Sequence, residues 1–359
     1  MSKAKVLLGL SGGVDSSVAA FILKKEGYQV DALFMRNWED DDGSPYCSIK
    51  EDFMDAAFVA NQIKIDLIEA NFSKEYKNKV FNYFLKELKL GRTPNPDILC
   101  NREIKFNCFF NYAMELGYDF ISTGHYVRNK ILNGSTCLLK GKDHDKDQSY
   151  FLHSVREKAL AKTIFPLGKL TKTKVREIAK KEGFITSEKK DSTGICFIGE
   201  RPFPEFLNNY LSLNPGEILD ERGNKIGEHK GLPFYTLGQR QGLGIGGTKD
   251  SSNKAWYVAN KNQINNTLVA VQGNNHPLLM SNKLETRNLV LVNPIKSKKF
   301  LGKAKVRYRQ EDQNCQIEII NNKLQINFTK PQRAVTPGQS VVIYKNEVCL
   351  GGGEIHNIS

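Results

Sequence analysis

The stretch Gly9-Leu10-Ser11-Gly12-Gly13-Val14-Asp15-Ser16 follows the apolar run Val6–Leu8 and opens a helical pattern over residues 17–25. A strand that turns through glycines into a helix directs free backbone N–H groups and the positive end of the helix dipole at one point. The glycines let the backbone approach an anion closely, and the serines and Asp15 add polar groups. We therefore predict a phosphate-binding loop, against the plainer alternative of a serine-capped turn.

This loop is not the lysine-containing P-loop, because no Gly-Lys-Ser/Thr follows it. It resembles the SGGxDS loop of the ATP pyrophosphatases, which hold the pyrophosphate of ATP while its α-phosphate is attacked. The resemblance implies ATP as cofactor, with Mg2+ accompanying the nucleotide. It also implies that the chemistry is activation of a substrate oxygen by adenylation.

Size and composition describe a globular protein of two or three domains, with 359 residues, 40% of them hydrophobic and 25% charged. The N-terminus lacks a signal-peptide pattern, and no apolar run approaches the roughly twenty residues that span a bilayer. We therefore expect a cytoplasmic protein with no membrane partner. None of the 7 cysteines forms a C-x-x-C pair, which argues against a disulfide framework, an iron–sulfur cluster and a metal site.

The net charge of +13 suggests a polyanionic partner. The last quarter of the chain, residues 278–359, holds 13 Lys or Arg and 6 Asp or Glu. A lysine-rich composition that only keeps the protein in solution would produce the same balance. Charge alone therefore leaves nucleic acid binding open.

Strand and helix patterns alternate through the first 200 residues. Strands are predicted at 6–10, 30–35, 66–70 and 119–123, and helices at 16–26, 48–62, 73–90, 101–116 and 171–182. Such alternation predicts an α/β fold with a doubly wound parallel sheet and with the ligand at the carboxyl ends of the strands. The resemblance to the ATP pyrophosphatases implies that this sheet is of the adenine nucleotide alpha-hydrolase type.

The pattern changes after Cys196. A helix is expected over 201–211, a turn over 221–224 between two strands, and an ordered irregular loop over the glycine-rich 238–247. Short Val/Ile-rich runs at 304–308, 315–320, 324–328 and 340–344 predict a small antiparallel β-barrel. We expect an ATP-binding catalytic domain over 1–205, a small central domain over 206–277 and a C-terminal barrel domain over 278–359.

Two cysteines stand in contexts that favour chemistry. Cys100 ends a loop stiffened by Pro94 and Pro96, where a following helix would lower the pKa of its thiol, and Asp97 is near enough to exchange protons. Cys196 follows a polar, glycine-containing segment that could be exposed. The alternatives are a small buried hydrophobe for Cys100 and a strand cysteine for Cys196.

Eight motifs in register resemble the bacterial tRNA-specific 2-thiouridylases over the whole chain. They are the phosphate loop, Asn95-Pro96-Asp97…Cys100-Asn101, Gly124-His125-Tyr126, Lys146-Asp147-Gln148-Ser149-Tyr150, Gly194-Ile195-Cys196-Phe197-Ile198-Gly199, Gly238-Gln239-Arg240-Gln241-Gly242-Leu243, Val306-Arg307-Tyr308-Arg309 and Pro337-Gly338-Gln339. Each motif alone is weak to moderate, and the eight in order are strong.

This resemblance implies a mechanism. ATP adenylates the C2 oxygen of the wobble uridine, in tRNAs such as those for Lys, Glu and Gln, and pyrophosphate leaves. A persulfide on Cys196, loaded by a cysteine desulfurase or a relay protein, then delivers sulfur. Cys100 either attacks the activated base or resolves the persulfide into a disulfide with Cys196, and Asp97 acts as acid or base. The sequence leaves the donor, the oligomeric state and the choice between these roles of Cys100 open.

The resemblance also implies binding residues. Nucleotide contacts are expected from Gly9, Leu10, Ser11, Gly12, Gly13, Val14, Asp15, Ser16, Met35 and Gly124. Contacts with tRNA are expected from Asn95, Pro96, Asp97, His125, Lys146, Asp147, Gln148, Arg307, Tyr308 and Gln339. The alternative for His125 is a buried structural role. The alternative for Arg307 and Tyr308 is a position on an alternating edge strand.

Three other interpretations compete. An ATP pyrophosphatase acting on a small molecule shares the loop but gives no reason for Cys100 and Cys196 or a basic barrel. A non-catalytic RNA-binding module would tolerate loss of Asp15, Asp97 and both cysteines, which are all present. The iron–sulfur tRNA thiolases carry C-x-x-C cysteines, which are absent here.

Overall fold

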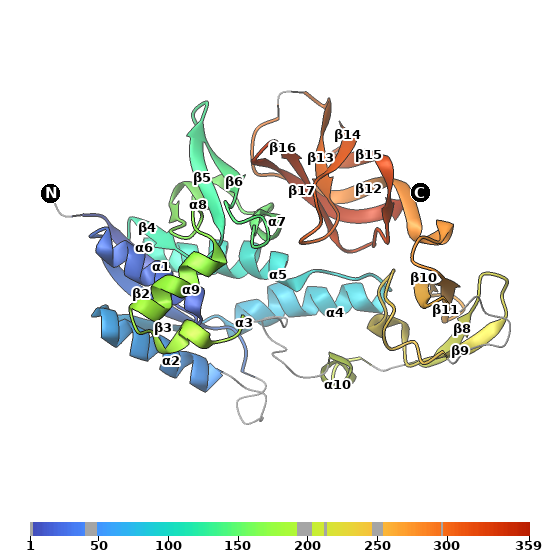
Figure 1. The fold of residues 1–359 in the computed structure, drawn as a ribbon, viewed down its shortest axis with the longest axis horizontal. Helices are drawn as coiled ribbons and strands as arrows, with labels where there is room; N and C mark the ends of the chain where they lie inside the picture. The colour runs from blue at the N-terminus through green and yellow to red at the C-terminus, as the bar shows by residue number, and fades with distance from the viewer. Residues whose placement is uncertain (1–2, 40–48, 192–202, 212–213, 246–253, 296) are drawn as a thin grey trace.

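The computed structural model describes residues 3–39, 49–191, 203–211, 214–245, 254–295 and 297–359 (Figure 1). An α/β part, a small β-rich part and a β-barrel follow one another along the chain, and helix α4 extends from the first part toward the other two. Within the described residues, no helix is long and apolar enough to cross a membrane.

The first part is built on a parallel sheet with strand order β3-β2-β1-β4-β7. Its strands are β1 (Lys5–Gly9), β2 (Gln29–Arg36), β3 (Leu67–Asn71), β4 (Phe120–Ser122) and β7 (Thr163–Ile164). Val6, Leu7 and Leu8 of β1 are fully buried, as a central parallel strand with both faces covered requires. The strand order reverses beside β1, so its carboxyl end opens on the crevice where such sheets bind ligands.

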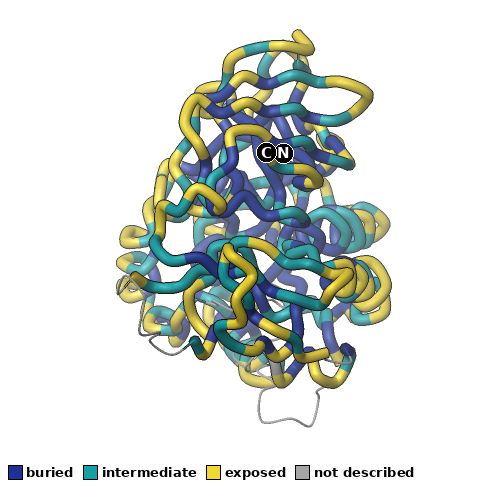
Figure 2. Tube along the Cα trace, turned by 90° about the vertical axis from the view of Figure 1, so that its right-hand side faces the viewer, coloured by how far each residue is buried: buried dark blue, intermediate teal, exposed yellow. Residues whose placement is uncertain are grey.

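Helices cover both faces of this sheet. One face packs against α1 (Val14–Lys25), α2 (Ile49–Ile63) and α9 (Lys172–Lys181). The opposite face packs against the helical segments between residues 73 and 115. The predicted doubly wound α/β fold is therefore confirmed, and the buried residues run through the interior of each part (Figure 2).

The two long helices predicted at 73–90 and 101–116 lie on the second face, and each is interrupted. The first consists of α3 (Ser73–Tyr76), a π-helical segment (Lys77–Phe81) and α4 (Asn82–Lys89). The second begins earlier than predicted, with α5 (Pro96–Leu99), a π-helical segment (Cys100–Phe109) and α6 (Phe110–Glu115). Asn95 is its N-cap, accepting hydrogen bonds from the backbone N–H of Asp97 and Ile98. Both prolines were expected in a loop, but Pro96 occupies the first helical turn.

A hairpin that the sequence analysis did not predict joins the first part to the barrel. Strands β5 (Val127–Leu132) and β6 (Ser135–Lys140) meet at Asn133-Gly134, where both residues have positive φ. Strand β6 pairs with β17 of the barrel through Leu139 and Val348. The remaining helices of this part are α7 (Ser149–Leu152), α8 (Glu157–Ala161) and a 3-10 turn (Ile185–Glu188).

The middle part holds a four-stranded sheet of order β10-β11-β8-β9. Its elements are α10 (Phe203–Asn208), β8 (Gly216–Leu219), β9 (Lys225–His229), a 3-10 turn (Leu232–Phe234), β10 (Trp256–Asn262) and β11 (Thr267–Gln272). Its small core includes Ile218, Val258 and Leu268. The predicted turn at 221–224 lies between β8 and β9, and residues 238–245 are irregular as expected.

The last part is a closed antiparallel barrel, as predicted. After a 3-10 turn (Pro277–Leu279), its strands are β12 (Met280–Leu291), β13 (Lys299–Lys305), β14 (Gln313–Ile320), β15 (Lys323–Arg333), β16 (Ser340–Lys345) and β17 (Val348–Ile358). Strand β12 pairs with both β15 and β17, which closes the sheet. Strand β13 ends at Lys305, so Arg307 and Tyr308 lie in a turn and not on the edge strand that was the alternative for them.

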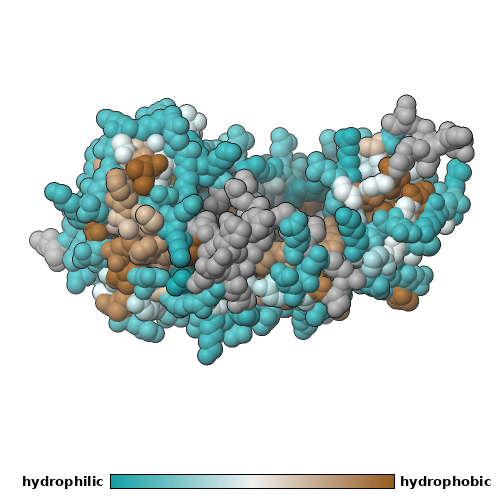
Figure 3. Space-filling view, turned by 90° about the horizontal axis from the view of Figure 1, so that it is seen from below, coloured by the Kyte–Doolittle hydropathy of each residue, from teal (hydrophilic) through white to brown (hydrophobic). Residues whose placement is uncertain are grey.

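The surface seen from below is mostly hydrophilic, with apolar residues gathered toward the two ends (Figure 3). At the α/β end, α2 exposes Met54 and Phe58.

Candidate nucleotide and RNA site

The predicted phosphate loop lies at the carboxyl end of β1, where it turns into α1. Gly12 has φ +72°, and a Cβ there would lie 2.2 Å from the backbone O of Asp52. Only glycine fits that position. Ser11 N and Oγ each lie 3.2 Å from Ser16 Oγ, which donates in turn to Gly13 O at 3.0 Å. The serines therefore hold the loop closed on itself as well as lining it.

Met35 and Gly124 come from other strand ends to the same place. The methyl group of Met35 lies 3.1 Å from the position of a Cβ on Gly9. A Cβ on Gly124 would lie 3.0 Å from the backbone of Asp15 and Ser16. The structure thus brings both residues against the loop, and a side chain at position 124 would be tight against the loop backbone.

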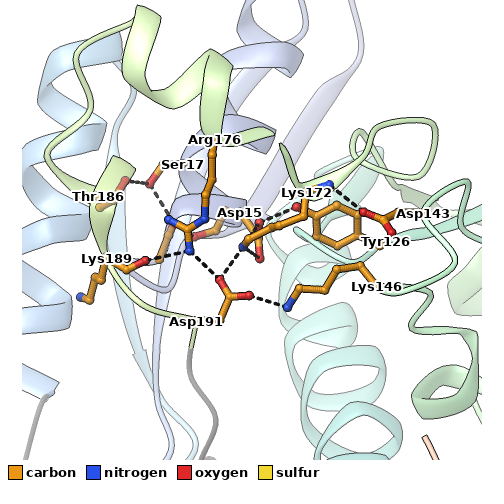
Figure 4. A network of polar contacts seen from close by, with 12 residues as sticks. Asp15, Ser17, Tyr126, Asp143, Lys146, Lys172, Arg176, Thr186, Lys189 and Asp191 are labelled. Carbon is orange, nitrogen blue, oxygen red and sulfur yellow. Dashed lines mark hydrogen bonds and ion pairs between the residues drawn. The ribbon is translucent and has the colours of Figure 1, made fainter. Parts of the chain in front are cut away.

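A network of charges surrounds Asp15 (Figure 4). Lys172 Nζ donates to the two carboxylate oxygens of Asp15 at 2.7 and 2.9 Å, and Tyr126 OH donates at 2.7 Å. Lys172 also pairs with Asp191 at 2.6 Å. Burial and the Asp15 carboxylate raise the pKa of Tyr126, so its hydroxyl stays a donor.

Asp191 gathers three cations near the loop. Lys146, Lys172 and Arg176 contact its carboxylate at 2.6, 2.6 and 3.0 Å. Burial acts to raise its pKa, but the lysines outweigh it and hold the pKa of Asp191 at about 2. An anionic ligand at the loop would meet this group of cations.

No sequence motif pointed to Lys172, Arg176, Asp191 or the role of Tyr126. One signal was available, because Lys172 and Lys174 stand in the first turn of α9, where the helix dipole disfavours cations. A lysine in such a place needs an anion, and here Asp15 and Asp191 supply it.

Asp97 and Cys100 lie on the first turns of the helix capped by Asn95, not on a loop ahead of it. Cys100 is 2% exposed, which agrees with the alternative of a buried cysteine, although it remains near the helix start. Burial raises the pKa of Asp97, and Lys105 opposes the change. A carboxyl group that keeps its proton to higher pH is suited to acid–base work.

Cys196 lies outside the described residues, so its distance from Cys100 is not defined. Of the other cysteines, Cys137, Cys315 and Cys349 are buried and Cys108 is half-buried. Burial raises the pKa of each of these four thiols. These four cysteines therefore fit a structural role.

Three of the expected RNA contacts, His125, Asp147 and Gln148, make hydrogen bonds inside the chain. His125 is 8% exposed, hydrogen-bonds to Thr123 Oγ1 at 2.9 Å, and burial holds its pKa well below the usual range. Asp147 is 4% exposed, and its carboxylate accepts from Gly141 N, Ser149 N and Ser149 Oγ. Gln148 accepts from Tyr126 N at 2.9 Å. These contacts give the three residues a role in holding the segment after Tyr126.

Lys146 connects the surroundings of the phosphate loop with an open groove on the surface. It pairs with Asp191 near the phosphate loop, and it lines an open groove of about 340 Å3 with His144, Asp145 and Arg309. Tyr308 packs on Phe151 with ring centroids 4.5 Å apart, and the Arg309 guanidinium lies 5.5 Å from its ring. The structure therefore brings the Lys146 and Tyr308 motifs together.

Arg307 and Gln339 make contacts inside the chain. The Arg307 guanidinium donates to Ala334 O at 3.2 Å and also to Arg333 O. Gln339 Nε2 donates to Thr93 O at 2.7 Å, and Thr93 N donates to Pro337 O at 3.0 Å. The barrel is thus tied to the segment that carries Asn95 and Asp97.

A buried carboxylate makes a second link between these parts. Glu87 on α4 is 2% exposed and accepts from both Arg92 and Arg287. Arg287 on β12 also donates to Glu354 on β17. Burial acts to raise the pKa of Glu87, but the two guanidinium groups hold it below the usual range.

Comparison with known families gives a match along the whole chain. A model described as the tRNA methyl transferase HUP domain matches residues 4–200. It is followed by a tRNA methyl transferase PRC-barrel domain over residues 204–272 and an aminomethyltransferase β-barrel domain over residues 281–355.

Two relatives that match this chain over nearly its full length have the same name. The tRNA-specific 2-thiouridylase MnmA of Pseudomonas entomophila (strain L48) is 57% identical over 356 residues, which cover 99% of this chain and 95% of that protein. The protein of that name from Pseudomonas savastanoi pv. phaseolicola (strain 1448A / Race 6) is 57% identical over 353 residues, 98% of this chain and 94% of its own. A solved 4-thiouridine synthetase–RNA complex with bound ATP is 20% identical, with a TM-score of 0.35 over 57% of this chain and 49% of its own, too low to carry an argument.

Proposed function

Because this chain belongs to the tRNA-specific 2-thiouridylase family, we propose the residues with which it adenylates and thiolates the wobble uridine of tRNA. The enzyme is a tRNA-uridine 2-sulfurtransferase that uses ATP. The descriptions of the family models refer to methyl transferases. Relatives at 57% identity over nearly the whole chain, however, are thiouridylases.

The observation that carries the proposal is the phosphate loop with its charges. The loop residues Gly9–Ser16 bind the pyrophosphate portion of ATP, with Met35 and Gly124 beside the adenosine. Lys172 and Lys146 stabilise the charge that develops as pyrophosphate leaves. Both lysines are held at the loop by ion pairs, with Asp15 and Asp191 for Lys172 and with Asp191 for Lys146. Lys172 must then move from Asp15 toward the phosphates.

Magnesium enters this proposal only with the nucleotide. Among the described residues, no group of three or more His, Cys, Asp or Glu side chains could hold a metal ion. The carboxylate of Asp15, within the loop, is one oxygen ligand that a magnesium ion on the phosphates could use. The ion would neutralise phosphate charge there.

Adenylation joins the C2 oxygen of the uridine to the α-phosphorus and releases pyrophosphate. The terminal sulfur of a persulfide on Cys196 then attacks C2, and AMP leaves with the oxygen. Cys100 thiolate attacks the Cys196 sulfur, which frees the thiocarbonyl and leaves a Cys100–Cys196 disulfide for an external thiol to reduce. The other course, attack of Cys100 on C2, stays open. Asn95 and Pro96 surround the base, and Asp97 moves the proton.

The RNA-binding surface extends from Lys146 to the barrel. Tyr308 and Arg309 combine an aromatic face with a cation, which suits unstacked bases and phosphates. Arg307, Gln339, His125, Asp147 and Gln148 complete the expected set, the last three by shaping this surface. We assign residues 1–205 to the ATP-binding catalytic domain, 206–277 to the central domain and 278–359 to the tRNA-binding barrel.

Two further parts of the proposal concern partners. Cys196 is loaded by a cysteine desulfurase or a relay protein, because a persulfide needs an external sulfur source. The substrates are tRNAs with a wobble uridine such as those for Lys, Glu and Gln, and they place the reaction in the cytoplasm.

Substitution of Asp15 tests the nucleotide site. Asp15→Ala should abolish release of labelled pyrophosphate with bulk tRNA while leaving the Kd for tRNA nearly unchanged, because the loop lies apart from the basic barrel. Asp31→Ala on β2 is a control of the same residue type away from the loop. Adenylation by Asp15→Ala at the wild-type rate would contradict the assignment.

Peptide mass spectrometry tests the sulfur site. After loading with a persulfide donor, the extra sulfur should be found on Cys196. Cys100→Ser and Cys196→Ser should both release pyrophosphate but form no thiolated tRNA. The roles would be reversed by sulfur on Cys100 in the wild type together with full activity of Cys196→Ser.

A further inference from the structure

Residues 141–149, which we call the linking segment, lie between the phosphate loop and the barrel. The segment follows strand β6, which pairs with β17 of the barrel, and it ends where α7 begins. Figure 1 shows the β5–β6 hairpin and α7 beside the barrel. The proposed function uses the linking segment as a surface for RNA, through Lys146. It does not account for the contacts that the segment makes inside the protein.

One side of the linking segment contacts the residues around Asp15. The side-chain oxygen of Gln148 accepts from Tyr126 N at 2.9 Å, and Gln148 N donates to Tyr126 O at 3.1 Å. Tyr126 OH in turn donates to Asp15 (Figure 4). Asp143 accepts from Lys172 N at 2.7 Å, at the start of the helix whose first lysine pairs with Asp15. The linking segment therefore holds two partners of Asp15, Tyr126 and Lys172.

Asp147 gives the linking segment its shape. Its carboxylate accepts from Gly141 N at 3.0 Å, from Ser149 N at 3.1 Å and from Ser149 Oγ at 2.9 Å. These bonds join the two ends of the segment. A Cβ on Gly141 would lie 2.5 Å from Tyr126 O, so the segment is also packed closely on Tyr126. A displacement of Asp147 would therefore be transmitted to Tyr126.

The barrel contacts this carboxylate and the hydroxyl group bonded to it. Lys305 Nζ, on β13, lies 3.9 Å from Asp147. Tyr344 OH, on β16, lies 3.2 Å from Ser149 Oγ. Because Ser149 gives its one hydroxyl hydrogen to Asp147, Tyr344 is the donor in that contact. Burial raises the pKa of Tyr344 well above its usual range, so its hydroxyl keeps the proton that it donates.

A second ion pair holds the two barrel residues in place. Lys140, the last residue of β6, pairs with Asp312 at 2.6 Å, and its ammonium group lies 4.2 Å from the centre of the Tyr344 ring. Asp312 also lies 3.8 Å from Lys305. Breaking one contact in such a largely buried group leaves a charge without its partner, which disfavours other arrangements. The position of the barrel therefore determines the position of Asp147.

A direct contact with RNA is the plainer role for a lysine of this barrel. The Lys305 side chain is only 12% exposed, however, and it lies between the carboxylates of Asp147 and Asp312. The Tyr344 side chain is fully buried. Neither residue is placed to bind a phosphate or to stack on a base.

We propose that Lys305 and Tyr344 of the barrel are positioning residues for ATP binding and adenylation, acting through Asp147 and the linking segment. This role rests on the nucleotide site proposed above. When either contact is lost, the linking segment shifts, and Tyr126 and Lys172 no longer hold Asp15 in its place in the phosphate loop. The barrel thus serves the nucleotide site as well as tRNA, because small displacements of positioned groups weaken binding and catalysis.

The affinity for ATP in the absence of RNA tests the proposal. Lys305→Met and Tyr344→Phe should each raise the Kd for ATP with Mg2+, measured by isothermal titration calorimetry, about fivefold, within the range for substitutions that act through a series of contacts. Lys299→Met removes an exposed lysine of the same strand, paired with Glu318, and should keep the wild-type Kd. Since no RNA is present, a residue that only contacts RNA cannot change this Kd.

The kinetics of adenylation give a second measurement. With saturating tRNA, each variant should lower kcat/KM for ATP in the release of labelled pyrophosphate about fivefold, while the Kd for tRNA changes less than about twofold. The double variant should lose little more than the weaker single variant, because both residues act through Asp147. Tyr344→Phe keeps the buried ring and removes only the hydroxyl group, so it tests the proposal even if Lys305→Met does not fold.

An unchanged Kd for ATP in the folded variants would overturn the proposal. Binding of ATP by the wild type only in the presence of tRNA would also overturn it, because the barrel would not then prepare the site. A raised Kd for tRNA with unchanged ATP binding would make Lys305 an RNA contact instead. Failure of the proposed function differs from all of these, since the wild type would then neither bind ATP nor release pyrophosphate with tRNA.

Discussion

Gln339 on the barrel donates a hydrogen bond of 2.7 Å to the carbonyl oxygen of Thr93, two residues before the helix cap Asn95. Thr93 N in turn donates to Pro337 O at 3.0 Å. A Cβ on Gly338 would lie 2.8 Å from Thr93 N, so the two segments are in close contact. The barrel therefore holds the segment that leads to Asp97.

Gln339→Ala should lower the kcat of thiolation about tenfold while the Kd for tRNA changes less than twofold. The reason is that a small displacement of Asp97 affects the chemical step more than it affects binding. Single-turnover thiolation and filter binding measure the two quantities. Gln316→Ala, at an exposed position of β14, is the control. A large rise in Kd with unchanged kcat would instead support the direct tRNA contact expected from the family resemblance.

Glu87→Gln should lower the free energy of unfolding by about 3 kcal/mol, because it leaves two guanidinium groups without their shared buried carboxylate. The pair Arg287–Glu87 links β12 to α4, so the barrel should also separate more readily from the α/β part. Urea denaturation followed by tryptophan fluorescence measures the change. Glu318→Gln breaks the exposed pair with Lys299 and should cost less than about 1 kcal/mol. Similar losses in both variants would show that burial of Glu87 is unimportant.

Lys172→Met should reduce the rate of pyrophosphate release about 100-fold or more, since it removes a cation from the phosphate site. Lys174, two residues further on α9, is 58% exposed and pairs with Glu177, so Lys174→Met is the matched control. Labelled pyrophosphate release at saturating ATP and tRNA measures both. Normal release by Lys172→Met would mean that the lysine only neutralises Asp15 and Asp191.

The sequence predicted the fold well where a local pattern determines it. The glycine-rich loop after a buried strand, the βα alternation and the Val/Ile runs of the barrel each follow from short-range periodicity. The start of the helix at Pro96 was missed because proline suits both a stiff loop and a first helical turn, and the Asn95 cap decides between them. The β5–β6 hairpin was missed although Asn133-Gly134 is a strong turn signal.

The site was predictable only as separate motifs. The meeting of Lys146 with Asp191 and of Gln339 with Thr93 depends on contacts across 45 and 246 residues. No local pattern contains that information. The burial of Asp147 and His125 also depends on tertiary packing, which no local sequence pattern reveals.

Asp97 has a further consequence for stability. Burial raises the pKa of its carboxyl group, so the folded state binds the proton more tightly than the unfolded state. Stability from this group is therefore greatest at low pH and is lost as the pH rises through the folded pKa. Asp97→Asn should consequently be at least as stable as the wild type at pH 7 while losing thiolation.

The pH dependence of activity provides the last prediction. Lys105 is the charge that opposes the rise in the pKa of Asp97, so Lys105→Met should raise that pKa further. If Asp97 acts as a base, thiolation increases with pH through its pKa, and if it acts as an acid, thiolation decreases. In either case the midpoint of that limb in a plot of kcat/KM against pH should move to higher pH in Lys105→Met. Lys130→Met, at an exposed position of β5, should leave the midpoint in place. A midpoint that stays fixed or moves to lower pH in Lys105→Met would assign the limb to another group.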